Sequence, residues 1–226
     1  KNILKMIIKK KYNFKWISYF RAQFAEREII ELMKESGCEG VFLGVESGNQ
    51  QILDNMNKKT TVEKYREAIK MLNEYGIITY LSMIIGFPGE TLETVKESIN
   101  LIEETKPTFF NANTMFFDPY TPIWEEREKY DIQGMELEWS HSTMDSNTAA
   151  DMIDNMFLNI KNSIAVPEYN FEFPGIFNLM NKGMSLEQVK ELLKSFNECV
   201  KEKILDSDKK EPSQEAIERL KKACKF

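Results

Sequence analysis

Apolar residues along the first 125 residues switch repeatedly between helical spacing and short continuous runs. Helical spacing over "EIIELMKESG" (28–37) leads into the apolar run "CEGVFLGVESG", and the same spacing over "YREAIKMLNEYG" (65–76) leads into "IITYLSMIIGFPGE". Gly37 and Gly76 stand where the last turn of a helix takes a left-handed residue. The pattern predicts two helix–strand units in succession.

Two further runs extend this series. "FKWISYFRAQ" (14–23) precedes the first helix, and "FFNANTMFFDPY" (109–120) follows a helical stretch at about 91–105. Strands that alternate with helices favour right-handed crossovers and a parallel sheet. We therefore predict an α/β fold, a partial (β/α) barrel whose helices cover one face only, with consecutive parallel strands near residues 15–21, 40–45, 78–84 and 109–116.

The pattern changes after about residue 124. Helical spacing dominates from "SNTAADMIDNMFLNIKNSI" (146–164) to the C-terminus, and we find no strand alternation there. We predict two domains, residues 1–125 as the partial barrel and residues 126–226 as a mostly helical C-terminal region. Thr60 with Glu63, and Ser185 with Gln188, have the spacing of capping boxes and predict helix starts near residues 61 and 186.

Composition narrows the classes of function. The chain has 226 residues, 42% of them hydrophobic, which is enough for a sizeable core. A formal charge of −6 argues against a general nucleic-acid-binding surface, because such binding needs many cations facing phosphates. No apolar run reaches the roughly 18 residues of a membrane span, and no signal-peptide pattern opens the chain. We expect a soluble cytoplasmic protein without nucleic-acid or membrane partners.

The cysteines give no sign of a disulfide framework or a metal cluster. Cys38, Cys199 and Cys224 are odd in number and widely separated, so we predict no metal site on this chain. Lys1 already lies in a helical pattern, which leads us to expect that the chain is a piece of a longer polypeptide.

Polar residues and a tight turn stand at the predicted strand ends, where ligands of parallel α/β folds bind. "FPGE", residues 87–90, fits a type II turn, and Gly86 before it allows a ligand to approach the backbone. Glu46 and Ser47 follow the second strand, and Lys58 precedes the next helix. A tight turn without a ligand, an exposed acid and a solvated lysine remain the alternative interpretations.

A family resemblance rests on five segments in order: "YFRAQ", "GVFLGVESGNQQIL", "MNKKTTVEKYREAIKMLNEYGI", "LSMIIGFPGET" and "FFDPYTPI". Together they resemble the later strands of radical S-adenosylmethionine (SAM) enzymes, and most of all the cobalamin-binding group and its coproporphyrinogen-oxidase-like relatives. The resemblance covers roughly residues 1–125. "WSHSTMDSNTAADMI" (139–153) is similar to segments that follow the barrel in cobalamin-dependent radical methyltransferases, including the phosphinate P-methylating branch.

The resemblance implies an enzyme that cleaves SAM to a 5'-deoxyadenosyl radical, which abstracts hydrogen from a small-molecule substrate, with cobalamin-dependent methyl transfer as the expected outcome. The family binds its [4Fe-4S] cluster through a Cys-x3-Cys-x2-Cys loop, which this sequence lacks. We expect the cluster and the cobalamin on a missing N-terminal part of the same polypeptide. The chain alone is therefore predicted to be inactive.

Individual roles follow from the same resemblance, by position. Glu46 matches a residue that contacts SAM, Lys58 a basic residue near its methionyl end, and Ser82 a ribose-binding position. Gly86 and Phe87 would border the adenine.

Four further residues carry less defined expectations. Phe116 would offer backbone groups to the adenine. Arg21, beside Tyr19, matches a variable polar position, and Ser47 is included with the cofactor-binding residues. His141 has two interpretations, a satisfied surface or core histidine, and a residue for substrate contact or proton transfer.

Two other classes of function stay open at this point. One is an ordinary lyase or aldolase barrel, which needs a strand-end lysine or a set of metal-binding carboxylates. The other is a non-catalytic binding module derived from such a barrel. A cluster-binding cysteine motif in the preceding sequence distinguishes the radical enzyme from the module.

Overall fold

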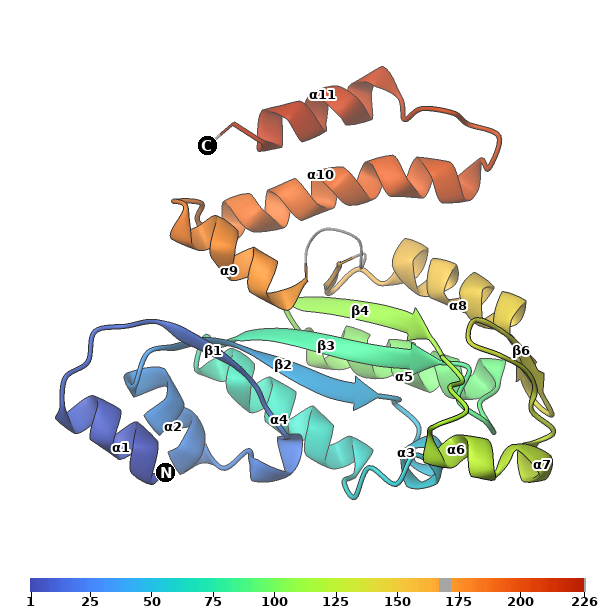
Figure 1. Cartoon of the computed structure of the whole chain (residues 1–226). Helices are drawn as coiled ribbons and strands as arrows, with labels where there is room; N and C mark the ends of the chain where they lie inside the picture. Colours follow the sequence, from blue (N-terminus) through green and yellow to red (C-terminus); the bar gives the residue numbers. More distant parts are fainter. Residues whose placement is uncertain (167–171, 226) are drawn as a thin grey trace.

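A five-stranded parallel sheet forms the centre of the computed structural model, which describes residues 1–166 and 172–225 (Figure 1). The strand order is β1-β2-β3-β4-β8 and each neighbouring pair is parallel. The strands are β1 (Trp16–Tyr19), β2 (Cys38–Glu46), β3 (Ile78–Ile85), β4 (Phe109–Thr114) and β8 (Ile164–Ala165). The predicted α/β class and the four consecutive parallel strands are confirmed.

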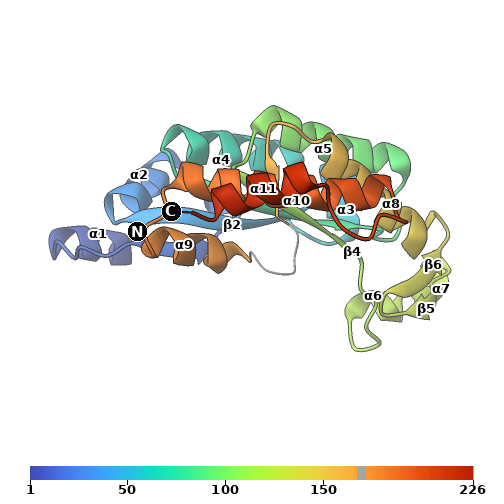
Figure 2. The same ribbon diagram turned by 90° about the horizontal axis from the view of Figure 1, so that it is seen from above.

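Helices cover one face of this sheet along most of its length (Figure 2). They are α2 (Arg27–Glu35), α4 (Val62–Glu74), α5 (Leu92–Thr105) and α8 (Ser146–Asn159), while α1 (Asn2–Lys9) packs beside α2 and the short α3 (Gln50–Asn55) follows β2. Alternate residues of β2, namely Val41, Leu43 and Val45, are fully buried in the core beneath these helices. Their neighbours in the sequence therefore face the opposite side of the sheet.

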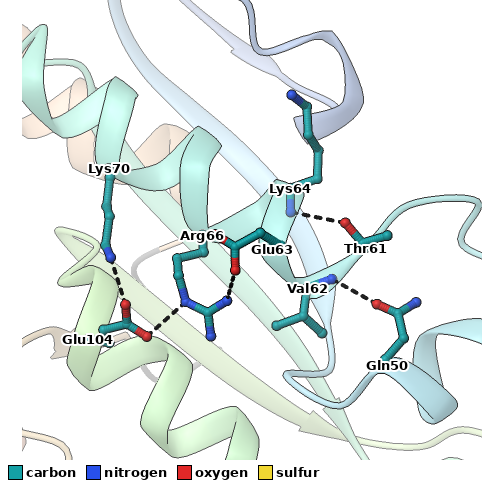
Figure 3. Close-up of polar contacts among 8 residues, drawn as sticks. All are labelled: Gln50, Thr61, Val62, Glu63, Lys64, Arg66, Lys70 and Glu104. Carbon is teal, nitrogen blue, oxygen red and sulfur yellow. Dashed lines mark hydrogen bonds and ion pairs between the residues drawn. The ribbon is translucent and has the colours of Figure 1, made fainter.

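Exposed ion pairs tie α4 to α5 on the outside of this layer (Figure 3). Glu104 of α5 accepts hydrogen bonds from Arg66 Nε at 2.8 Å and Lys70 Nζ at 2.6 Å. Surface pairs of this kind contribute about 0–1 kcal/mol each. The attachment of α4 therefore depends mainly on its four buried side chains, Tyr65, Ala68, Ile69 and Leu72.

The start of α4 corrects one of the predicted caps. Thr61, not Thr60, is the N-cap, because its Oγ1 accepts a hydrogen bond from the Lys64 amide at 3.1 Å. Gln50 Oε1 accepts a second one from the Val62 amide at 3.0 Å, as Figure 3 shows. The capping box at Ser185 is confirmed at the start of α10 (Leu186–Leu205).

The second face of the sheet is also covered, over the amino-terminal half of its strands. The Phe173 ring of α9 (Phe173–Asn181) lies 5.9 Å from the Phe42 ring and 5.7 Å from the Tyr80 ring. α10 packs against α9, and α11 (Gln214–Ala223) lies on α10. Our prediction of helices on one face only was wrong, because this face presents bulky apolar side chains that must also leave water.

The C-terminal half contains strands that we did not predict. β5 (Gln133–Met135), β6 (Glu138–His141) and β7 (Met144–Asp145) form a small antiparallel sheet beyond α6 (Pro122–Glu125) and α7 (Arg127–Tyr130). These strands are too short to show a period of two. β8 pairs with β4, so one sheet contains strands from both sides of the predicted domain boundary at residue 125. The division into two domains stays a prediction.

No helix in the described part of the chain has the length and apolar character that a membrane crossing demands.

A close contact between β2 and α9 generates a stability prediction. A Cβ added at Gly40 would lie 2.3 Å from Cζ of the buried Phe177 ring. Gly40→Ala is therefore expected to lower the free energy of unfolding by about 1–3 kcal/mol, as overpacking does. Urea denaturation measures this loss, and Phe177→Leu combined with Gly40→Ala should cost less than the two single changes summed. Strict additivity would show that α9 does not press on β2.

Candidate functional site

A hollow of about 660 Å³ opens at the carboxyl ends of β1 and β2. Three of the predicted site residues line it together, namely Arg21, Glu46 and Lys58, and Tyr19 and Tyr65 are among its other lining residues. The parallel register explains the meeting of Arg21 and Glu46, because the carboxyl ends of neighbouring parallel strands lie at one edge of a sheet. Lys58 arrives from the loop between α3 and α4. We call this hollow the Glu46 hollow.

Three non-glycine residues that line the Glu46 hollow have a left-handed backbone conformation. Glu46 has a φ of 69°, Asn57 of 56° and Lys59 of 54°, although none of them is glycine. Left-handed backbone is costly for residues with a Cβ, and such residues concentrate at functional sites. The register of β2 against β3 also shifts between Gly44 and Glu46. This irregularity turns Glu46 out of the regular strand geometry and toward the hollow.

Glu46 and Lys58 form a half-buried ion pair. Lys58 Nζ lies 3.3 Å from Glu46 Oε1, and their side chains are 26% and 17% exposed. Burial raises the pKa of the Glu46 carboxyl, and the Lys58 charge opposes that rise. The pair therefore places one negative and one positive group side by side where water is partly excluded.

Two residues that shape this pair were missed by sequence reasoning. A Cβ at Gly44 would lie 2.4 Å from Glu46 Oε1, so the carboxylate folds back over the space that this glycine leaves. Tyr65 donates a hydrogen bond from its hydroxyl to the Gly44 carbonyl at 3.0 Å, and burial raises the pKa of Tyr65 to about 12. A glycine inside an apolar strand was the available signal for close approach.

Ser82 lies beside this arrangement, and Ser47 does not. Ser82 is the register partner of Gly44 on β3 and shares its face of the sheet, although it does not line the Glu46 hollow. Ser47 is fully buried, and its Oγ accepts a hydrogen bond from the Asn49 amide at 3.1 Å. Ser47 thus shapes the turn into α3.

The turn after β3 has the predicted geometry. The Glu90 amide donates to the Phe87 carbonyl at 2.9 Å, and Gly89 has a φ of 93°, as a type II turn requires. Gly86 has a φ of 95°, and its amide donates to Glu90 Oε2 at 2.6 Å. Glu90 is fully buried, and its other carboxyl oxygen has no hydrogen-bond partner.

The His141 ring forms a hydrogen bond with the Gly86 carbonyl. Its Nδ1 accepts a hydrogen bond from the Thr143 amide at 3.3 Å, which leaves Nε2 to carry the hydrogen and donate to the Gly86 oxygen at 3.0 Å. Burial lowers the pKa of His141, in agreement with a neutral ring. Both ring nitrogens are engaged, so the structure favours the satisfied histidine over the substrate contact.

Trp139 packs against both His141 and Gly86. Its ring stacks on His141 with centroids 5.2 Å apart, and its Nε1 donates to the Met115 carbonyl at 2.7 Å. A Cβ at Gly86 would lie 2.2 Å from the Trp139 ring, so only glycine fits there. Phe116, next to Met115, is 49% exposed and lines a different hollow, between β4, α8 and α10.

The residues fit some of the expected cofactors and not others. Glu46 and Lys58 are complementary to the ammonium and carboxylate of an amino acid such as the methionyl end of SAM. In the described residues no group of three His, Cys, Asp or Glu side chains is placed to hold a metal. Burial raises the pKa of Cys38 to about 12, which disfavours the thiolate that an iron–sulfur cluster needs. A cluster does not fit the cysteines of this chain.

The strain at Glu46 generates one prediction. Glu46→Gly and Glu46→Ala both remove the ion pair, but only glycine accepts a φ of 69° without penalty. The glycine variant is expected to be more stable than the alanine variant by about 1 kcal/mol. Urea denaturation of the two variants gives this difference, and an alanine variant of equal or greater stability would mean that the strain is absent.

Glu90 generates a prediction about pH. Burial raises the pKa of its carboxyl from 4.5 to about 7 in the folded protein, so between these values the folded chain holds a proton that the unfolded chain has lost. This contribution to stability is present below pH 4.5 and disappears as the pH rises through 7. Glu90→Gln, which cannot ionise, should gain stability relative to the original protein as the pH rises over this window. Unfolding at a series of pH values measures the gain, and a constant difference would contradict the assignment.

Three comparisons bear on identity. Residues 2–102 match the family model described as the radical SAM superfamily. The anaerobic magnesium-protoporphyrin IX monomethyl ester cyclase of Cereibacter sphaeroides is 33% identical over 101 residues, which are 45% of this chain and 16% of that protein. A tRNA-2-methylthio-N(6)-dimethylallyladenosine synthase of Clostridium botulinum is 42% identical over 71 residues, 30% of this chain and 16% of that protein.

The fold is similar to part of a solved structure. The methyltransferase TsrM of Kitasatospora setae, in its structure with cobalamin and a [4Fe-4S] cluster, aligns with a TM-score of 0.60 over 98% of this chain and 49% of that chain, at 15% identity. The chain spans only 16% of the length of each curated relative named above and about half of this structure. The resemblance predicted from the sequence is confirmed over residues 2–102, somewhat less than half of the chain, which are similar to the radical SAM superfamily.

Proposed function

We propose that this chain forms the later part of the barrel of an enzyme that cleaves SAM, and that the Glu46 hollow takes the methionyl end of that molecule. The observation that carries the proposal is the ion pair of Glu46 and Lys58 at the carboxyl end of β2. A zwitterionic amino acid exchanges for such a pair without leaving either charge unpaired, because its ammonium meets Glu46 and its carboxylate meets Lys58. A volume of about 660 Å³ is of the size that small-molecule sites have.

Residues on and after the neighbouring strand β3 are proposed to bind the nucleoside part of SAM. Ser82 lies on β3, the next strand of the sheet, about 4.8 Å away at each level, and the Gly86 turn follows the end of that strand. The proposal assigns Ser82 to the ribose, and Phe87 with the backbone of Phe116 to the adenine. Gly86 positions this turn and is given no ligand contact, because Glu90 and His141 bind its backbone groups and the Trp139 ring fills the space beside it. Arg21 lines the Glu46 hollow on the β1 side and adds a second positive charge for the carboxylate.

We also propose that a preceding part of the same polypeptide carries the [4Fe-4S] cluster. The cluster, where present, supplies the electron that cleaves SAM, and the cysteines of this chain do not fit it. Large apolar side chains are exposed on the β1 side of the sheet, among them Ile3 at 70% and Tyr19 at 74%. A further strand and helix packed there would cover them. On this proposal the chain alone is inactive. In its most specific version, the proposed reaction is cobalamin-dependent methyl transfer to a small-molecule substrate in the cytoplasm.

The test uses the full-length protein in calorimetric titration with SAM. Glu46→Gln or Lys58→Met should weaken binding by about 1–3 kcal/mol, the range for a lost charge-assisted hydrogen bond. The matched control is Lys70→Met, which removes an ion pair on the outer face of α4 and should leave the affinity unchanged.

Thermal melts accompany the titrations, so that loss of binding is separated from loss of the fold. Unchanged affinity in both variants would reject the proposed site. A preceding sequence without a Cys-x3-Cys-x2-Cys motif would instead favour the non-catalytic binding module.

A further inference from the structure

A second hollow, of about 620 Å³, lies between the carboxyl-terminal half of β4 and the helices α8 and α10. Residues 111–114 of β4 form one wall, Ile153 and Phe157 of α8 another, and Val200 and Ile204 of α10 a third. We call it the β4 hollow. It is separate from the Glu46 hollow, with which it shares no lining residue.

The walls of the β4 hollow are apolar and remain partly in water. Its four apolar residues from α8 and α10 are only half buried, and Phe116 and Leu137 at the rim are 49% and 57% exposed. Apolar surface of this kind gains about 25 cal/mol per Å² when a ligand removes it from water. A concave arrangement of apolar side chains with a few polar groups is the usual form of a small-molecule site.

An exposed carboxylate, that of Asp154 on α8, borders this apolar lining. Among the described residues that line the β4 hollow, Asp154 alone is charged, and no ion pair within residues 1–166 and 172–225 involves it. Desolvation raises the pKa of its carboxyl, as does the like charge of Asp151 one turn earlier on α8. The charge complementarity of the hollow therefore favours a cation and disfavours an anion.

The β4 hollow also adjoins the face of the sheet that carries the proposed SAM site. Asn111 of β4 is the register partner of Ser82, and Asn113 is the partner of Ile84. Side chains of Asn111 and Ser82 lie at one level on neighbouring strands, about 4.8 Å apart. A ligand in the hollow would thus stand beside the proposed nucleoside.

We propose that the β4 hollow binds an amphipathic small molecule, with a flat apolar body between the walls from α8 and α10 and a protonated amine facing Asp154. That this ligand is the substrate of the radical reaction rests on the proposed function. The binding itself does not, because every residue that forms the hollow belongs to this chain.

A matched pair of probes tests the charge preference on the chain as it is. 1-Naphthylmethylamine, a cation at pH 7, and 1-naphthoate, an anion, carry the same ring system and differ in the sign of their charge. The cation is expected to bind more tightly, and NMR shift changes should centre on residues 111–114 and on the α8 residues Ile153 and Phe157. Fluorescence anisotropy of the naphthalene ring gives both dissociation constants.

Three variants separate the charge from the apolar walls. Asp154→Asn should weaken the cation about two- to fivefold and leave the anion unchanged or tighter, as expected for one partly solvated charge. Glu187→Gln is the matched control, because it removes an acid at the start of α10 that pairs with Lys190 and does not line the hollow. Ile204→Asn should weaken both probes together, since it removes apolar wall. Thermal melts confirm that each variant is folded.

Two results would overturn the inference. One is equal binding of the two probes with no effect of Asp154→Asn, which rejects the cationic ligand. The other is the absence of shift changes at residues 111–114 up to millimolar probe, which rejects the hollow as a site. Probe binding that persists while the full-length protein fails to bind SAM would reject the proposed function alone.

Discussion

The backbone of Gly86 joins the parts of the molecule that form the site. Its amide is held by Glu90, its carbonyl by His141, and the space where a side chain would stand is filled by the Trp139 ring. Because Trp139 also holds the Met115 carbonyl after β4, the small antiparallel sheet binds the ends of two neighbouring strands. A buried peptide group must be paired, and here both of its partners are titratable side chains. The positions of the strand ends therefore depend on contacts that reach 55 residues along the sequence.

The second face of the sheet is covered by a helix at the amino-terminal half of its strands and carries small and polar side chains toward the carboxyl end. α9 covers the amino-terminal half of the second face, where Phe42 and Tyr80 present their rings. Toward the carboxyl end, that face carries Gly44, Ser82 and Asn111 in register across three strands. Small and polar side chains leave room where bulky ones do not. The Glu46 hollow and the β4 hollow therefore flank the same stretch of sheet.

Much of the fold was predictable because it follows from local spacing. Helix ends at Gly37 and Gly76, the type II turn at Pro88 and Gly89, and the capping box at Ser185 depend on residues within a few positions of each other. The parallel order of four strands follows from helices between them. The same reasoning placed Glu46, Lys58 and Ser82 at one edge of the sheet, where Glu46 and Lys58 meet in the Glu46 hollow and Ser82 lies outside it on the neighbouring strand. It misplaced a cap by one residue, at Thr60, because two adjacent threonines offer the same side chain.

The sequence by itself determined the order of elements, the parallel sheet and the polar residues at its carboxyl edge, since helical and strand periods and turn residues act over short distances. Only the tertiary structure decided that α9 packs on the second face, that β8 joins β4, and that Glu46 takes a left-handed backbone over Gly44. It also decided that His141 serves the Gly86 carbonyl, which no spacing in the sequence reveals. These features depend on contacts between residues far apart in the chain, whose distances are set by packing and not by the period of any one element.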